Sequence, residues 1–427
     1  MAAILPLTAL HYELARAGRL QELVSPPYDV IDAELRARLA AASPYNVVGI
    51  DLPEPGPAGG DRYAHAAALL ARWREEGALA HDATPAIWAL TQDYVDPDGR
   101  ERTRQGFLCR VRVEDYGAGR IRPHERTHPG PKEDRLRLTR ATRTNLSPIF
   151  SLFSDPGHTA WGALQPHVRT SAPFGEATDA DGTVHRLWRV TDPSALATVV
   201  EAVAGSELLI ADGHHRYETA RAYAEEVGGE GAHRWVLMCL VALEDPGLTV
   251  FPTHRLVSGL REDPARQEAL AEAIRRDFDV EELADERALV PTPAGDGRVR
   301  IGYMDAHHLK PFLLTLKDPA IADAALPERA APYRRLDTAV LEALLLKGPL
   351  GMTDATIDHL DGLAYARDFD EALARLRDGG ADAGFFMGAT PIAHVREVAE
   401  AGESMPPKST YFFPKVPTGL VFNPLAD

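Results

Sequence analysis

The sequence predicts an α/β protein with mixed sheets, arranged in two or three subdomains. Its 427 residues are too many for one ordinary hydrophobic core. Segments with helical periodicity alternate with apolar, strand-like runs along the chain. The composition, 45% hydrophobic and 26% charged, is that of a globular protein and argues against extensive disorder. We expect one subdomain over residues 1–115, a second over 116–260 and a third over 261–427.

The first half of the chain supplies helices and strands in alternation. We expect a helix over 64–76, because Ala67, Leu70 and Trp73 fall on one face. Strands are expected over 86–94 and 106–113, and the turn residues Asp96-Pro97-Asp98-Gly99 between them predict a hairpin. A short helix over 134–143 and a strand over 149–153 follow.

The same alternation continues in the second half. A helix over 193–203 precedes a buried strand over 208–211, and the next helix, over 216–227, is closed by Gly228-Gly229. The segment around 285–298 is rich in Pro, Gly and charge, which favours a boundary or a long loop. The remaining expected elements are strands over 235–243, 298–304 and 383–387, a helix over 263–278, a helix capped by Asp337, and a helix from Thr390-Pro391 to near Gly402.

Charge and cysteine content narrow the classes of partner and the compartment. The net charge of −17 opposes binding to nucleic acid, so a phosphate ligand needs a local cluster of Arg, Lys and His. Cys109 and Cys239 lie in apolar runs, so we expect two buried free thiols in a reducing cytoplasm rather than a disulfide. No apolar run reaches the roughly 18 residues of a membrane span, and the N-terminus lacks a basic signal region, so neither a membrane span nor a signal peptide is expected.

The strongest functional pattern is Asp212-Gly213-His214-His215-Arg216, which follows a buried strand and opens a helix. The N–H groups and the dipole of a helix start favour an anion, and Gly213 lets the backbone approach it closely. The two histidines and Arg216 add donors for phosphate oxygens, and Asp212 can orient a histidine or hold a metal ion. The alternative is a strand-to-helix turn with an Asp cap and solvated histidines.

A second polar cluster runs from residue 123 to 148. Its part from 120 to 143 holds seven Arg, one Lys and two His against three acids, which is the local field that a phosphate needs. We expect His124 and Glu125 to act as acid and base. We expect Lys132 and Arg135 to contact the anion, and Asn145 and Ser147 to contact the substrate. An exposed, charged loop is the alternative.

The same cluster contains His124-Glu125-Arg126-Thr127-His128, which matches the H-E-x-x-H pattern of zinc proteases. That chemistry needs both histidines on one face of a helix, with the glutamate as general base. Pro129-Gly130-Pro131 follows at once, and Pro129 disfavours the helical conformation at His128. A zinc hydrolase therefore stays as the alternative from another class.

Smaller clusters carry weaker signals. The segments 25–31 and 43–48 each place a tyrosine after proline, which favours a rigid turn with a packed Tyr, although Asp29 and Asn46 could line a pocket. In the irregular segment 405–415 we expect contacts to the anion or substrate from Lys408, Ser409 and Thr410. A lysine that only covers apolar surface with its stem is the alternative there.

Four motifs in order give the chain a family resemblance. They are Ser-Pro-Pro-Tyr-Asp-Val-Ile at 25–31, Pro-His-Glu at 123–125, Ala-Asp-Gly-His-His-Arg-Tyr-Glu-Thr-Ala at 211–220 and Pro-Pro-Lys-Ser-Thr-Tyr-Phe at 406–412. Together they resemble a bacterial and archaeal family catalogued as a domain of unknown function. The Asp-Gly-His-His-Arg element also resembles the phosphate-binding signature of the ParB/sulfiredoxin superfamily. That superfamily includes free-serine kinases, and a pyrophosphate-dependent serine kinase activity is associated with proteins of this kind.

This resemblance implies a ParB/sulfiredoxin-like catalytic core with an insertion over 116–260, and a C-terminal subdomain that closes the site. It implies that Glu125 takes the proton of the serine hydroxyl, and that Asp212 and the residues 214–216 contact phosphate. The 86 residues between Glu125 and Asp212 exceed the spacing in the compact kinases. An insertion between Ile149 and Ala204 therefore has to fold away from the two motifs.

We accordingly expect a phosphotransferase that makes O-phosphoserine from free L-serine. The expected donor is pyrophosphate, ADP or ATP, with Mg²⁺ bridging the donor phosphates. No Walker A pattern G-x-x-x-x-G-K-[ST] occurs, which excludes a P-loop kinase. The third alternative is a non-catalytic, nucleotide-responsive or DNA-associated module. The acidic charge and the lack of a helix-turn-helix pattern weigh against it.

Overall fold

The computed structural model of the chain describes residues 2–56, 59–97, 99–117, 120–124, 129–292 and 296–426. The chain folds into two compact units. Unit 1 comprises residues 1–123, 127–249 and 414–427, and unit 2 comprises residues 124–126 and 250–413. The chain therefore leaves unit 1 after Thr249 and returns to it at Pro414, which gives unit 1 both the N-terminal half and the C-terminal end.

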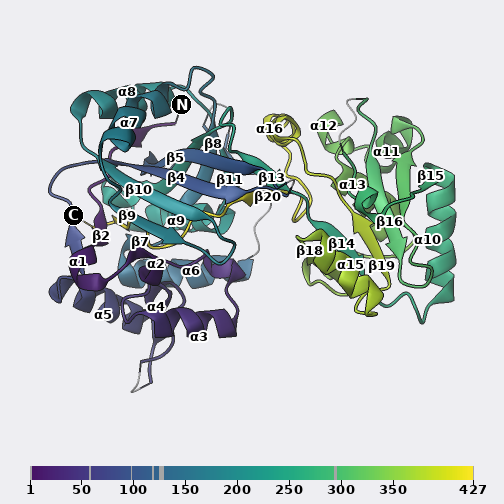
Figure 1. Ribbon diagram of the computed structural model, residues 1–427, viewed down its shortest axis with the longest axis horizontal. Coiled ribbons are helices and arrows are strands. Elements are labelled where there is room, and N and C mark those ends of the chain that lie inside the picture. Colours follow the sequence, from purple (N-terminus) through teal and green to yellow (C-terminus); the bar gives the residue numbers. More distant parts are fainter. Residues whose placement is uncertain are drawn as a thin grey trace. The chain divides into compact units, whose positions relative to one another are not determined.

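A nine-stranded mixed sheet forms the centre of unit 1 (Figure 1). Its strands, in spatial order, are β6 (Ile121–Arg122), β11 (Leu208–Asp212), β8 (Ile149–Phe153), β12 (Trp235–Ala242), β5 (Glu101–Arg112), β4 (Ile87–Val95), β10 (Val184–Val190) and β9 (Gly175–Thr178), with β1 (Ile4–Leu5) on β5. β12 runs parallel to β8, and β11 runs parallel to β6. The other pairs are antiparallel, so the prediction of a mixed α/β protein is confirmed.

Two groups of helices pack against this sheet. α7 (Thr159–Thr170) packs on α8 (Pro193–Val203), and α6 (Pro129–Thr142) contacts both α5 (Arg62–Glu75) and α9 (His214–Val227). Figure 1 shows α7 and α8 above the sheet and α5 and α6 below it. The remaining elements are α1 (Leu14–Ala17), α2 (Leu20–Leu23), η1 (Tyr28–Val30), α3 (Ala33–Ala42), α4 (Val48–Asp51), η2 (Ala232–Arg234), and the strand pairs β2 (Leu10–Tyr12) with β3 (Leu79–His81) and β7 (Thr144–Asn145) with β21 (Asn423–Pro424).

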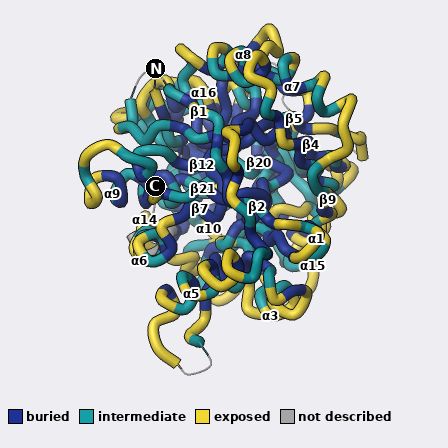
Figure 2. The backbone as a smooth tube through the Cα atoms, turned by 90° about the vertical axis from the view of Figure 1, so that its left-hand side faces the viewer, coloured by how far each residue is buried: buried dark blue, intermediate teal, exposed yellow. Residues whose placement is uncertain are grey.

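The inner strands of unit 1 are mostly buried, and β8 is buried along its whole length. Figure 2 shows β12 buried, whereas α3 and α5 carry many exposed residues. Cys109 lies opposite Met238 on β5 and β12, and both cysteines are free and buried. Burial raises the pKa of the Cys239 thiol to about 12. The predicted pair of buried free thiols is confirmed, and such thiols are unreactive.

The segment between β8 and β11 forms α7, β9, β10 and α8. β10 and β9 join the far edge of the same sheet, and β11 then pairs directly with β8, with Leu209 opposite Leu152. This segment therefore folds away from the line between β8 and β11. Because Glu125 lies outside the described residues, its distance from Asp212 stays a prediction. α6 begins at Pro129, five residues before the expected start. The two prolines fit there, because the first turn of a helix needs no N–H donors.

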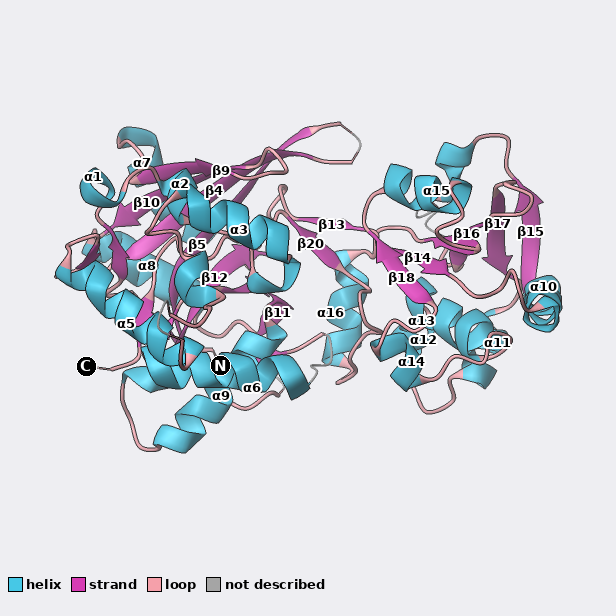
Figure 3. Cartoon of the chain, turned by 90° about the horizontal axis from the view of Figure 1, so that it is seen from below, coloured by secondary structure: helices cyan, strands magenta, loops and turns pink. Residues whose placement is uncertain are grey.

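Unit 2 is built on a six-stranded antiparallel sheet. In spatial order its strands are β15 (Phe278–Glu282), β17 (Phe312–Leu316), β16 (Arg300–Asp305), β19 (Ala383–Phe386), β14 (His254–Val257) and β18 (Leu363–Ala366). Alternate residues face two separate cores: Leu256 and Phe386 face one, and Val257 and Phe385 face the other. Figure 3 shows α15 (Phe369–Arg377) and α13 (Asp337–Leu341) on opposite sides of this sheet.

The starts of two helices in unit 2 differ from prediction. Leu336, not Asp337, is the N-cap of α13, and Asp337 accepts a hydrogen bond from the N–H of Thr338 at 2.7 Å. Thr390 does not cap α16, because its hydroxyl donates to the carbonyl of Ser409 at 2.9 Å. The remaining elements are α10 (Pro264–Asp277), η3 (Glu286–Leu289), α11 (Pro319–Ala325), α12 (Ala331–Arg334), a π-helix (Glu342–Lys347), α14 (Asp354–Asp358), α16 (Ile392–Glu400), and the pair β13 (Thr249–Phe251) with β20 (Tyr411–Phe413). Among the described residues, no helix has both the length and the apolar content needed to cross a membrane.

Candidate functional site

The predicted phosphate loop connects β11 to α9 in unit 1. Gly213 is the N-cap of α9 and has a φ of +93°, in the left-handed region that favours glycine. A Cβ at this position would lie 2.9 Å from Cζ of Arg216. Gly213 is therefore required both by its backbone conformation and by the closeness of the Arg216 guanidinium, which folds back over the helix start.

Asp212 is held between two cations. Nζ of Lys415 forms an ion pair with Oδ1 of Asp212, and Nη2 of Arg216 lies 2.5 Å from Oδ2. Burial by itself would raise the pKa of Asp212, but Lys415 and Arg216 outweigh it and hold that pKa well below its usual range. The carboxylate is ionised at neutral pH, and the three side chains together keep one positive charge in excess.

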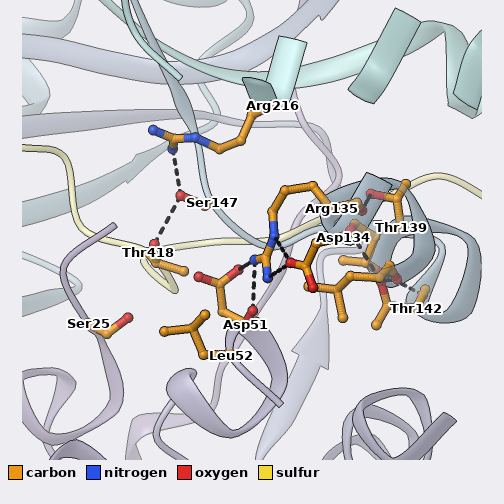
Figure 4. A network of polar contacts seen from close by, with 12 residues as sticks. Ser25, Asp51, Leu52, Asp134, Arg135, Thr139, Thr142, Ser147, Arg216 and Thr418 are labelled. Carbon is orange, nitrogen blue, oxygen red and sulfur yellow. Dashed lines mark hydrogen bonds and ion pairs between the residues drawn. The ribbon is translucent and has the colours of Figure 1, made fainter. Parts of the chain in front are cut away.

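Arg216 also ties the loop to the segment that precedes β8. Its Nη1 donates to Oγ of Ser147 at 2.6 Å and to the carbonyl of Pro148. Ser147 in turn accepts a hydrogen bond from the hydroxyl of Thr418 at 2.9 Å (Figure 4). The structure thus brings together two residues predicted for the site, Arg216 and Ser147, and fixes the direction of the guanidinium.

Lys415 reaches Asp212 because buried polar side chains hold its backbone. Nε2 of Gln92, on β4, donates to the carbonyl of Lys415 at 3.0 Å. Nη2 of Arg104, on β5, donates to the carbonyl of Pro414 at 2.5 Å. Arg104 is 1% exposed, and burial lowers the pKa of its guanidinium to about 10. These contacts seat the C-terminal segment of unit 1 on the sheet.

Lys415 is the site residue that the sequence analysis missed. The segment 405–415 contains two lysines, and only Lys408 was singled out. One signal was available: Lys415 lies shortly before the apolar run Leu420-Val421-Phe422, which predicts a buried segment. Lys408 by contrast has a positive φ of 56°, and its carbonyl accepts from Arg255 at 3.1 Å.

The predicted anion contacts of α6 have acidic partners in the structure. Arg135 donates from Nη1 to Oδ1 of Asp51 at 3.1 Å and from Nη2 to Oδ2 of Asp134 at 2.5 Å. Its guanidinium also lies 4.4 Å from the ring centre of Tyr28. Nζ of Lys132 lies 3.4 Å from Oε2 of Glu218. Their roles as phosphate contacts stay predictions.

The other predicted residues of unit 1 are placed as follows. His214 is buried and His215 is half-buried, and both belong to the first turn of α9. Asn145 accepts hydrogen bonds on Oδ1 from the N–H of Leu237 at 3.1 Å and from Asn423 at 2.9 Å. Asn145 therefore has a structural role, and the roles of His214 and His215 as phosphate contacts stay predictions.

Four predicted residues belong to unit 2. His124 is 1% exposed, and its Nε2 lies 2.7 Å from the hydroxyl of Thr410. Ser409 is buried, and its Oγ lies 2.9 Å from the hydroxyl of Thr338 and 2.7 Å from the carbonyl oxygen of Pro406. Lys408 precedes it. Glu125 lies outside the described residues, as does His128 of the H-E-x-x-H match, so the base and the zinc alternative both stay predictions.

Mg²⁺ prefers several oxygen ligands in octahedral geometry. Among the described residues, no group of three or more His, Cys, Asp and Glu is arranged to hold a metal ion. Asp212 has a cation on each of its two oxygens. These side chains do not fit an ion held by the protein itself. Mg²⁺ is commonly bound through substrate phosphates and only one or two protein carboxylates.

Fold and site define a mixed α/β protein whose largest sheet carries a cationic loop at the start of a helix. The family model matches residues 4–339, and the chain belongs to the family described as "Protein of unknown function (DUF1015)". No curated protein matches the sequence.

Solved structures give distant matches. A conserved hypothetical protein from Pyrococcus furiosus is 16% identical, with a TM-score of 0.35, over 70% of this chain and 90% of that one. A free serine kinase in complex with AMP is 15% identical, with a TM-score of 0.36, over 70% of this chain and 89% of that one. SbnI with a C-terminal truncation, from Staphylococcus aureus, is 12% identical, with a TM-score of 0.35, over 74% and 81%. At such low TM-scores these similarities support no conclusion about this chain.

Proposed function

We propose that the chain is a small-molecule phosphotransferase, which moves a phosphoryl group from pyrophosphate, ADP or ATP to the hydroxyl of free L-serine. The observation that carries this proposal is that two cations, Lys415 and Arg216, both pair with Asp212 at the start of the 14-residue helix α9. Fixed positive charge and a helix N-terminus both favour a bound diphosphate, and phosphoryl transfer depends mainly on positioning and on charge neutralisation. The resemblance of the 211–216 loop to serine kinases supports the choice of acceptor.

Each residue of the loop has a separate task in this proposal. Asp212 keeps Lys415 and Arg216 in place before the donor binds, so the site loses little freedom when phosphate arrives. The donor oxygens then share these cations with the carboxylate, and His214 and His215 add further donors. Gly213 leaves room for the Arg216 guanidinium over the start of α9. Any Mg²⁺ would be held by the donor phosphates and not by these side chains.

The transfer itself exchanges one P–O bond for another. The serine hydroxyl oxygen attacks the terminal phosphorus of the donor, and the bond to the leaving phosphate breaks. Glu125 takes the hydroxyl proton, as the resemblance implies, and His124 supports it. Ser147, which accepts from Arg216, is proposed to lie against the acceptor. Lys408, Ser409 and Thr410 remain proposed contacts.

The test is direct. The purified protein is incubated with L-serine, Mg²⁺ and pyrophosphate, ADP or ATP in turn, and O-phosphoserine is measured by mass spectrometry. The proposal expects product with at least one donor, and a strong decrease in Arg216→Lys. Arg72→Lys, on the exposed face of α5, is the matched control and is expected to behave as wild type. Absence of O-phosphoserine with every donor would overturn the proposal.

A further inference from the structure

A small cavity in unit 1 borders Arg216. Its water-accessible space is about 40 Å³, and its lining includes Tyr28, Asp51, Arg135, Ser147, Arg216 and Thr219. One water needs about 10–15 Å³ measured in this way, so the cavity has room for about three waters. This space is far too small for a nucleotide and limits a ligand to the size of the smallest amino acids.

Two buried polar atoms of this lining have no hydrogen-bond partner among the described residues. They are Oδ2 of Asp51 and Oγ1 of Thr219. Asp51 is 3% exposed and Thr219 is 4% exposed. Only Oδ1 of Asp51 faces Arg135, and Figure 4 shows the other carboxylate oxygen turned away from Arg135 toward Ser147 and Thr418. A buried carboxylate oxygen without a donor is costly, which favours a ligand that supplies one.

The charges around the cavity indicate what kind of donor fits. Arg135 is already paired with Asp51 and Asp134, and Arg216 is paired with Asp212. The unsatisfied charged atom is therefore an acceptor on a carboxylate. An ammonium group is its natural complement, because it carries a positive charge and three donors but no acceptor.

We infer that this cavity is an amino-acid site, in which Asp51 binds the α-ammonium group and Thr219 contacts a second polar group of the ligand. The inference rests on the proposed function, since it names the residues that hold the phosphoryl acceptor. Arg216 borders the cavity and also bonds to Ser147 and Asp212. A hydroxyl directed toward Ser147 therefore approaches the phosphate loop. The small volume selects serine over larger amino acids.

The test is calorimetric binding without any phosphate donor. L-serine is expected to bind wild type at least about tenfold more tightly than 3-hydroxypropionate, which lacks the ammonium group. Asp51→Asn places an N–H₂ donor or an uncharged oxygen at the position of Oδ2. It is expected to weaken serine binding at least about tenfold and to leave 3-hydroxypropionate binding unchanged, so that the preference disappears. Asp134→Asn, at the other carboxylate of Arg135, is the matched control and keeps the preference.

A second variant guards against a folding defect in Asp51→Asn. Thr219→Val keeps the shape of the side chain and removes a buried hydroxyl that has no partner, so its melting temperature is expected to stay at or above that of wild type. It is expected to weaken serine binding severalfold. Serine binding equal to wild type in both variants overturns the inference, because water alone then fills the cavity.

The outcomes separate this inference from the proposed function. If serine binds with the expected preference and no donor yields O-phosphoserine, the kinase proposal fails and the amino-acid site stands. If O-phosphoserine forms and Asp51→Asn has the wild-type KM for serine, the amino-acid site fails and the kinase proposal stands.

Discussion

Lys415→Met is the most informative single change, because it removes one of the two cations of Asp212 and keeps a long side chain. A hydrogen bond to a charged group contributes about 1.5–3 kcal/mol, so donor affinity is expected to fall roughly tenfold to a hundredfold. Stability is also expected to fall. The side chains of Lys415 and Asp212 are 18% and 16% exposed, so the loss is less than the 3–5 kcal/mol of a fully buried pair, on the order of 1–3 kcal/mol.

The stability loss has a defined pH dependence. Lys415 and Arg216 hold the folded-state pKa of Asp212 below its unfolded value, although burial opposes them. Stability from such a carboxylate is fully present above the unfolded pKa of about 4 and is lost as pH falls through the folded pKa. The difference in free energy of unfolding between wild type and Lys415→Met is therefore largest at pH 7 and becomes smaller below about pH 4. Urea denaturation at the two pH values measures it.

A double variant separates stability from function. Lys415→Met alone leaves no excess charge among the three side chains, whereas Lys415→Met with Asp212→Asn again leaves one cation in excess. The double variant is expected to regain stability but not donor binding or O-phosphoserine formation. Lys310→Met, which removes an ion-paired lysine that is 56% exposed, is the control and is expected to match wild type. Wild-type pyrophosphate affinity and rate in Lys415→Met would refute the reasoning.

Four further changes test individual residues. Arg216→Lys keeps the charge but loses the planar fork, so pyrophosphate affinity measured by calorimetry is expected to fall at least about tenfold; unchanged affinity would remove Arg216 from the donor site. Gly213→Ala forces an L-residue to a φ of +93° and places its Cβ against Arg216. The free energy of unfolding, measured by urea denaturation, is expected to fall by about 1–2 kcal/mol, and donor binding is expected to weaken. A free energy of unfolding equal to that of wild type would contradict this. Glu125→Gln is expected to lower the single-turnover rate roughly 10²–10⁴-fold and to leave donor affinity intact. His128→Ala is expected to lower that rate far less. If the protein instead contains stoichiometric zinc, and His128→Ala loses both zinc and activity, the zinc hydrolase is supported. Burial raises the pKa of Asp337 to about 6, so the free energy of unfolding falls as pH rises from about 4 to about 6. Asp337→Asn is therefore expected to be more stable than wild type at pH 7, by up to about 3 kcal/mol, but not at pH 4. The control is Asp361→Asn at an exposed position, and equal stability of wild type and Asp337→Asn at pH 7 would contradict the raised pKa.

Elements with strong local signals were predicted as they occur in the structure. The strand 149–153 and the helix 193–203 have the expected bounds. Asp192 caps that helix by accepting from the N–H of Ala195 at 2.8 Å, and Pro193 is its first residue. Caps and apolar periodicity act within a few residues, so the sequence alone is enough to specify them.

The sequence by itself also determined the loop from Asp212 to Arg216. An apolar strand, a glycine and a helix start follow one another within a few residues, and each acts through its own backbone. Only the tertiary structure decided which distant side chains complete it. Lys415 lies 203 residues from Asp212, and Asp51 lies 84 residues from Arg135. Lys408 and Lys415 have the same side-chain chemistry. Only at Lys415 do Arg104 and Gln92 hold the backbone, through the carbonyls of Pro414 and Lys415. Such anchoring depends on hydrogen bonds from two strands to a loop far away in the chain, which no local pattern encodes.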